Sequence, residues 1–429
     1  MMRSRLYRLG GRFGVGVVIV GLMVVVGQRL ASVPRAQAHS VKSVPNNFPQ
    51  LNPNGFAATF STRGSVNLSG EYFQAQGSNG RSCSTCHMPE NAWSINPATI
   101  RLLFDLTGGT HPIFNALDAD NPNNDLSTVE ARRANYSMML TRGVFRRGGA
   151  PRADREWDVV AVDDPHGFAN VNQIVQWRRI MPTINFHLGS ATVNWDGGNT
   201  VDTDQLAGLT NQATRNVTGA QQGQPAPPEV IADIVNFETS LSTAQLFSFV
   251  AGPLNAGGAR GGPEALSQMT KTQGRFDLFD AWINSPIPSR RQIARGQELF
   301  NSVNSNGRSC NGCHNSANNG TNINNALFDI GTASAEARTP DLPLYTFRNR
   351  VTGEERQLTD TGQGNVTGHW NDLGRFKTPT LRALSARAPY FHNGGAATLD
   401  DVVRHYEQFL GFQFTDEQRQ DLVAFLKAL

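Results

Sequence analysis

The ten-residue phrase SNGRSCSTCH, at residues 78–87, returns almost unchanged as SNGRSCNGCH at residues 305–314. The two phrases contain all four cysteines of the chain, as two C-x-x-C pairs that are each followed directly by a histidine. The similarity extends upstream, where SGEYFQAQGSNGRSC parallels RGQELFNSVNSNGRSC. The repeat therefore predicts two copies of one structural module.

The motif C-x-x-C-H is the attachment signal for c-type haem. The two thiols bind the porphyrin as thioethers, and the adjacent histidine becomes the proximal ligand of the iron. A thioredoxin-like dithiol needs no following histidine, and zinc ribbons place their two pairs far closer together than this chain does. The sequence thus predicts two covalently bound haems, held by Cys83, Cys86 and His87 and by Cys310, Cys313 and His314.

The N-terminus combines a basic stretch over residues 3–12, an apolar run over residues 13–27 and an A-x-A sequence at residues 36–38. This order is typical of a secretory signal peptide cleaved after Ala38, and the apolar run is short for a membrane span. An uncleaved anchor is the alternative, and it is the case in which we expect a membrane. Either reading predicts a periplasmic or secreted protein, and the net charge of +3 argues against nucleic acid as a partner.

Strand signals are weak along the chain, so the sequence predicts a mainly α protein with two tandem cytochrome c-type domains, long loops and an insertion in the first domain. A stretch rich in Gly and Pro separates the two domains. The expected organisation is a signal peptide at 1–38, an extended N-terminal arm at 39–65, an N-terminal haem domain at 66–249 with an insertion at about 92–176, a linker at 250–287 and a C-terminal cytochrome c domain at 288–429.

Two further segments resemble a known family. RRIMPTINFHLGSATVNWDGG, at 178–198, resembles the R-N-x-P-T…F-W-D-G-R segment of bacterial dihaem cytochrome c peroxidases and the related MauG enzymes. FKTPTLRALSARAPYFHNGGAATLDDVVRHY, at 376–406, resembles the F-K-T-P-T-L-R-N…T-A-P-Y-F-H-D-G…L segment of the same family. The resemblance implies a reactive N-terminal haem, a C-terminal haem that relays electrons, and a tryptophan between them, here Trp195.

The resemblance also bears on the sixth ligand of the second haem. The peroxidases place a methionine seven residues after a leucine that corresponds to Leu399, and this chain has Tyr406 there and no methionine after Met269. MauG has a tyrosine at this place, so the resemblance implies Tyr406 as the ligand, with His405 as the alternative. A phenolate would stabilise ferric and higher states of the iron, whereas a thioether stabilises the ferrous state.

The surroundings of the first haem depart from the family pattern. Counting from Trp195, the distal histidine falls on Asn172, a glutamine is retained as Gln205, and the acid–base glutamate is replaced by Arg215. An arginine cannot move a proton at neutral pH, although it can stabilise a departing anion.

Other residues could therefore act at the first haem. His166, His187 and Glu229 are candidates for the missing proton shuttle, and Met138 or Met139 could instead ligate the iron. The family also binds calcium through an Asn side chain and two backbone carbonyls. The Asn position is Ile180 here, which argues against calcium, while the carbonyl positions are Arg387 and Pro389.

These observations favour a MauG-like exported enzyme that uses peroxide or dioxygen at the N-terminal haem and oxidises a protein or organic substrate. One alternative is a conventional cytochrome c peroxidase supplied by a small electron-donor protein. Another is a dihaem electron carrier without enzymatic activity. The expected site comprises Trp195, Gln205, Arg215 and His166 beside the haem-attaching residues and Tyr406.

Overall fold

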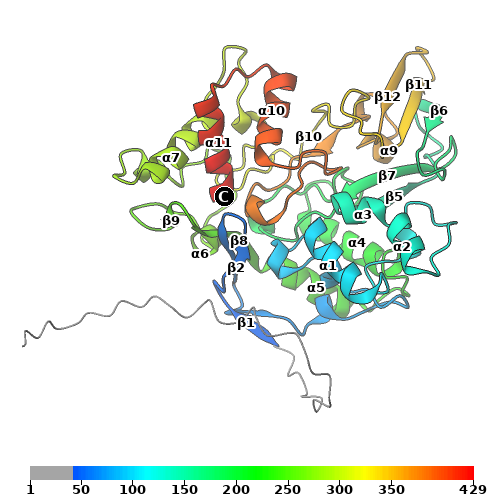
Figure 1. The fold of residues 1–429 in the computed structure, drawn as a ribbon, viewed down its shortest axis with the longest axis horizontal. Helices are drawn as coiled ribbons and strands as arrows, with labels where there is room; N and C mark the ends of the chain where they lie inside the picture. The colour runs from blue at the N-terminus through cyan, green and yellow to red at the C-terminus, as the bar shows by residue number, and fades with distance from the viewer. Residues whose placement is uncertain (1–41) are drawn as a thin grey trace, which may run out of the picture. The chain divides into compact units, whose positions relative to one another are not determined.

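The computed structural model describes residues 42–429, which form one unit, and the predicted signal peptide lies outside these residues. Its first part is an antiparallel sheet in the order β2-β3-β8-β9, drawn in blue and green in Figure 1. The strands are β2 (Gln50–Asn52), β3 (Gly55–Ser61), β8 (Leu241–Ser248) and β9 (Gly252–Pro253). A short ladder pairs β1 (Ser43–Pro45) with β4 (Ser65–Asn67).

The predicted extended arm is thus a set of paired strands. Strand β3 lies between β2 and β8, with Ala57 and Ala58 buried and Thr59 hydrogen-bonded to Thr243 of β8 at 2.9 Å. Pairing satisfies the backbone of this segment, which a free arm would leave to water.

The first module is built from η1 (Glu71–Phe73), η2 (Cys83–Thr85), α4 (Gln205–Thr218) and α5 (Pro228–Thr239). Helix α5 begins with Pro228 at its first position, where a missing N–H costs nothing. Its buried residues include Ile231, Ile234, Val235 and Glu238, which share one face because they follow the helical spacing i, i+3, i+4 and i+7. This face joins the core that contains Tyr72, Trp93, Leu209 and Val217.

The insertion contains α1 (Pro97–Thr107), α2 (Val129–Asn135), α3 (Ser137–Arg142), β5 (Val144–Gly149) and β6 (Trp157–Asp163). Strand β5 pairs with β7 (Ile174–Arg179). Strand β6 pairs with β11 (Leu344–Asn349), which also pairs with β12 (Glu355–Leu358). Figure 1 shows the green β6 beside the yellow β11, so the insertion shares a sheet with the C-terminal half of the chain.

The second module consists of α7 (Pro288–Asn301), α8 (Cys310–Cys313), α10 (Leu399–Leu410) and α11 (Asp416–Ala428). Helices α7 and α11 pack very closely, since a Cβ atom at Gly296 would lie 1.9 Å from the carbonyl oxygen of Asp421. The predicted linker instead belongs to this core. It contains α6 (Pro263–Ser267), and Phe276, Phe279 and Trp282 pack with Phe425 of α11. These buried aromatic residues outweigh the Gly- and Pro-rich composition around them.

The remaining α-helix is α9 (Gly364–Thr367), and the remaining strands are β10 (Leu327–Phe328) and β13 (Phe376–Lys377), which pair with each other. Helices account for 32% and strands for 18% of the structure, so the prediction of a mainly α protein was wrong and the fold is mixed. Most strands are short and pair with distant segments, which leaves little periodic signal in the sequence. Within residues 42–429, no helix is both long and apolar enough to cross a membrane.

Candidate functional site

The first C-x-x-C-H segment faces a cavity of 510 Å³, which Cys83, Cys86 and His87 all line. The cysteines are free thiols rather than a disulfide. The His87 Nδ1 atom lies 3.0 Å from the carbonyl oxygen of Trp93, which favours the tautomer with a free Nε2. Burial lowers the pKa of His87 to about 4. A neutral imidazole with Nδ1 held by a carbonyl is the form that ligates metals, so these residues fit a c-type haem.

The second C-x-x-C-H segment repeats this arrangement at a cavity of 270 Å³, lined by Cys310, Cys313 and His314. The His314 Nδ1 atom lies 2.5 Å from the carbonyl oxygen of Gly320, and burial lowers the pKa of His314 to about 4. The two histidines are therefore prepared alike, each with a backbone carbonyl six residues further along the chain.

Tyr406 lines the second cavity from α10. Burial raises the pKa of its phenol, which favours the protonated side chain. Because metal ligands bind in their deprotonated form, coordination would release the phenolic proton. His405, its predicted rival, does not line the cavity, because its Nε2 atom lies 2.7 Å from the carbonyl oxygen of Ile330 and its ring stacks on Phe409. The structure thus brings Tyr406, and not His405, to the same cavity as His314.

The two cavities share part of their lining, and Trp195 is one of the residues that line both. The indole Nε1 of Trp195 donates to the carbonyl oxygen of Arg179 at 2.8 Å, and the backbone N–H of Lys377 donates to the carbonyl oxygen of Trp195 at 2.7 Å. The Trp195 ring also lies 6.5 Å from the ring of His392, which lines the second cavity. These contacts hold the Trp195 side chain in the lining that the two cavities share.

A buried ion network fixes the segment that contains Trp195. Arg178 donates from Nε and Nη2 to the two carboxylate oxygens of Asp360, both at 2.8 Å, and from Nη1 to Asp196. All three side chains have low exposure. Because Asp196 follows Trp195 directly, this network positions the tryptophan from the side of the first cavity.

Several basic residues line the cavities and fit the two propionate carboxylates that each haem carries. In the first cavity these are Arg81, Arg147 and Arg215, of which Arg81 also pairs with Asp118 at 2.6 Å. Arg179 and Lys377 line both cavities, and Arg387 lines the second. Within residues 42–429, Arg179, Arg387 and Lys377 form no ion pair with a carboxylate, so an anion would relieve the cost of burying Arg179 and Arg387.

The predicted glutamine does not reach either cavity. Gln205 is the first residue of α4, and its Nε2 donates to the carbonyl oxygen of Ser190 at 2.8 Å. Arg215 lies on the same helix and does line the first cavity, as does Gln212. The spacing carried over from the family selected Gln205, whereas the helix presents Gln212 about two turns later.

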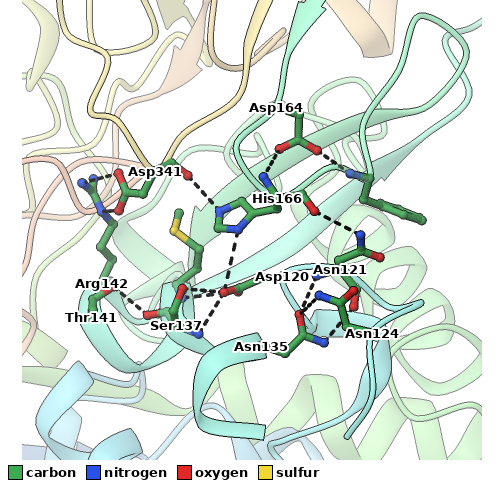
Figure 2. Close-up of polar contacts among 12 residues, drawn as sticks. Asp120, Asn121, Asn124, Asn135, Ser137, Thr141, Arg142, Asp164, His166 and Asp341 are labelled. Atoms are coloured by element: carbon green, nitrogen blue, oxygen red, sulfur yellow. Dashed lines mark hydrogen bonds and ion pairs between the residues drawn. The ribbon is translucent and has the colours of Figure 1, made fainter. Parts of the chain in front are cut away.

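His166 also lies away from both cavities, in the polar network of Figure 2. Its Nε2 atom lies 3.0 Å from the carbonyl oxygen of Asp341, and its Nδ1 atom lies 4.0 Å from the carboxylate of Asp120. Asp120 in turn accepts hydrogen bonds from the N–H and hydroxyl of Ser137. The contacts of His166 therefore link the insertion to the segment before β11.

The other candidates for the first haem are likewise elsewhere. The His187 Nε2 atom lies 3.2 Å from the carbonyl oxygen of Leu266, and Glu229 is exposed in the first turn of α5. Met138 and Met139 are buried in hydrophobic clusters. None of these four residues lines either cavity.

Sequence reasoning missed Glu238, which lines the first cavity from α5. The signal was present, because Glu238 is the only charged residue in the stripe formed with Ile231, Ile234 and Val235. A carboxyl group at a core position of an amphipathic helix is uncommon and indicates a site.

The positions expected for calcium hold other contacts. At the first carbonyl position, the Arg387 oxygen accepts a hydrogen bond from Nη2 of Arg179 at 3.1 Å, and the side chain at the Asn position, Ile180, is apolar and offers no ligand atom. In the described part of the chain, no three His, Cys, Asp or Glu side chains are grouped to hold a metal ion.

The curated relatives of this chain are haem oxidoreductases of the c-type class. They are bacterial cytochrome c peroxidases and MauG proteins. Cytochrome-c peroxidase IdrP1 of Denitromonas iodatirespirans is 28% identical over 174 residues, which is 36% of this chain and 44% of the relative. Cytochrome c551 peroxidase of Nitrosomonas europaea is 44% identical over 69 residues, 16% of this chain and 21% of the relative.

Methylamine utilization protein MauG of Methylorubrum extorquens is 34% identical over 84 residues, 14% of this chain and 24% of the relative. Each of these matches thus spans less than half of the relative. No family model matches the chain. Among solved structures, a MauG-like protein associated with microbial copper homeostasis is 16% identical with a TM-score of 0.35, covering 59% of this chain and 73% of that one.

Proposed function

We propose that this protein is a MauG-like dihaem oxidoreductase, which uses peroxide or dioxygen at the first cavity to oxidise a protein or organic substrate. The observation that carries the proposal is the position of Tyr406 in the cavity of His314. A bound haem would supply the redox chemistry, and a His/Tyr ligand pair would favour its oxidised states. Such a centre suits the storage of oxidising equivalents better than exchange with ordinary electron carriers.

The residues of the chain have distinct proposed roles around the haems. His87 and His314 would ligate the haem irons, and the four cysteines would attach the porphyrins. Trp195 connects the two sites electronically, since it is the oxidisable side chain that lines both cavities. Arg215 stabilises anionic oxygen in the first cavity by charge and hydrogen bonding.

A conventional cytochrome c peroxidase is the second candidate, favoured by the printed names of the relatives. It would reduce hydrogen peroxide with electrons from a small donor protein. The proposed location for either function is the periplasm or the exterior of the cell, supported by the basic and apolar stretches before Ala38. The number of haems is part of the proposal and rests on the two C-x-x-C-H segments, each of which lines its own cavity.

The ligand assignment can be tested with Tyr406→Phe. This variant removes the phenol oxygen and keeps the ring, so we expect loss of the low-spin signal of the second haem in the EPR spectrum of the diferric protein. Tyr390→Phe is the matched control, because Tyr390 lines the same cavity but its hydroxyl donates to the carbonyl oxygen of Leu384 at 3.1 Å.

An unchanged spectrum of Tyr406→Phe would contradict the assignment. A second variant, Tyr406→Met, distinguishes the MauG-like function from the conventional peroxidase function. A His/Met centre should have a higher reduction potential and accept electrons from a donor protein, while oxidation of organic substrates should fall.

A further inference from the structure

The carboxyl group of Glu238 is unusual among the acids of the first cavity. Three acidic side chains line this cavity, and two of them are paired, Asp118 with Arg81 and Asp196 with Arg178. Glu238 is 3% exposed and forms no ion pair within residues 42–429. Its Oε2 atom has no hydrogen-bond partner there. Such an atom is costly in a core unless it serves a ligand or carries a proton.

The helix holds Glu238 firmly at this place. Its neighbour Phe237 packs against Tyr72 at 4.6 Å and Trp93 at 5.3 Å between ring centroids. Ile234 and Val235, one turn earlier, are buried in the same core. The side chain therefore cannot turn toward solvent without breaking the packing of α5, and it stays directed at the cavity that Cys83 and His87 also line.

Burial favours the protonated form of this side chain and raises the pKa of Glu238 to about 8. Four other polar groups belong to the elements around α5. Tyr72 of η1 and Cys83 of η2 have pKa values raised mainly by burial, with a smaller contribution from the charge of Glu238. Arg215 of α4 lines the same cavity, and His187 of η5 (Phe186–Leu188) contacts the Leu266 carbonyl.

We propose that Glu238 is the acid–base group of the first cavity, which gives a proton to an oxygen atom of peroxide and regains it from solvent. This inference rests on the proposed function. Reduction of hydrogen peroxide to two water molecules takes two protons and two electrons. Glu238 supplies a proton as the O–O bond breaks. The electrons come from the protein or organic substrate, which is thereby oxidised.

The other candidates lack one of the two requirements, which are access to the cavity and an available proton. His166, His187 and Glu229 do not line the cavity. Arg215 lines it but holds its protons too tightly to transfer them. Asp118 and Asp196 line it but are already engaged in ion pairs with Arg81 and Arg178.

The test compares Glu238→Gln with Glu229→Gln in the haem-loaded protein. Both variants make the same chemical change on α5, and Glu229 is exposed and outside the cavity. We expect Glu238→Gln to lower the rate constant for reaction with hydrogen peroxide on the order of 100-fold. Glu229→Gln should leave it unchanged, and Glu238→Asp should recover part of the rate. Equal rates for Glu238→Gln and wild type would overturn the role.

A second readout does not depend on turnover. At pH 7 the infrared spectrum of the wild-type holoprotein should contain a protonated-carboxyl band that Glu238→Gln lacks and Glu229→Gln retains. Absence of this band would show an ionised Glu238 and overturn the proposal. If the band is present and the wild-type protein does not react with peroxide or dioxygen, the proposed function fails, and the role of Glu238 fails with it. If Glu238→Gln loses haem, the wild-type rate decides, since it must fall as the pH rises through 8.

Discussion

The two cavities are alike on the side of the histidine and differ around the rest of their walls. His87 and His314 each use a carbonyl six residues later to set the tautomer. The wall of the first cavity includes Arg147, Arg215 and Glu238, whereas that of the second is dominated by apolar residues of α10, α11 and the preceding loop. The contrast separates two tasks. A polar cavity can exchange small polar molecules and protons, and an apolar one can hold a redox centre apart from water.

Among the variants that test this difference between the cavities, Arg178→Met should cause the largest loss in the free energy of unfolding. The substitution leaves the buried carboxylates Asp360 and Asp196 without their cation, and breaking a buried pair costs about 3–5 kcal/mol. Denaturant unfolding of the holoprotein measures this loss. Arg348→Met is the control, because its pair with Glu355 is exposed and should contribute at most about 1 kcal/mol. Similar losses in both variants would show that the network does not support the wall.

A second effect, of similar size, concerns the pH dependence of stability. In the unfolded chain Glu238 ionises near its ordinary value of 4.5, while in the folded protein its pKa is about 8. The folded state therefore binds the extra proton between these values, and the free energy of unfolding should fall as pH rises from 4.5 to 8. The contribution is a few kcal/mol, at roughly 1.4 kcal/mol per pKa unit.

Unfolding curves of wild type and Glu238→Gln across this range provide the measurement. The difference between the two proteins should change with pH in this window and level off above it. A difference that is constant with pH would show that Glu238 titrates normally. The second cavity contains no comparable carboxyl group. The one acidic residue that lines it, Asp329, is 34% exposed and pairs with Arg356.

The smallest of these effects should come from Trp195→Phe. Phenylalanine keeps an aromatic ring in the shared wall but is harder to oxidise and lacks the N–H that donates to Arg179. We expect oxidation of the substrate to slow at least about tenfold, or ~1.4 kcal/mol in the barrier. The reaction of the first cavity with peroxide, followed by stopped-flow spectroscopy, should keep its rate. Equal slowing of both steps would mean that Trp195 supports the fold of the wall rather than the link between the cavities.

Local motifs were enough to single out the two C-x-x-C-H segments that line the cavities, because C-x-x-C-H is a contiguous signal whose chemistry requires that order. Tyr406 was also predictable, since the helix before it contains no irregularity between Leu399 and the cavity. Gln212 was not, because counting from Trp195 assumes a fixed loop length before α4. His166 was misplaced for a related reason: its neighbours come from β11 and the insertion, and no local pattern records such contacts.

Core residues were hardest to predict in segments whose composition is unlike that of a core. Trp282 and Phe276 lie in a segment with many Gly and Pro residues, so the segment resembles a linker although both rings are buried. Glu238 is the opposite case: it lies within an apolar stripe of α5, so the segment resembles ordinary core although it contains a residue that lines a cavity. In both cases the deciding information is the partner across the core, which lies far away in the chain.

The pairing of β6 with β11 has a consequence for how the chain folds. Trp157 of β6 opposes Asn349 of β11, so the sheet cannot close until residue 349 has been synthesised. Long-range pairing of this kind slows folding and leaves strand edges open in the meantime. During that interval Trp157, Phe347 and Tyr345 are exposed rather than buried. A newly made chain therefore passes through a stage that is vulnerable to aggregation, and a chaperone that shields the insertion would raise the yield of folded protein.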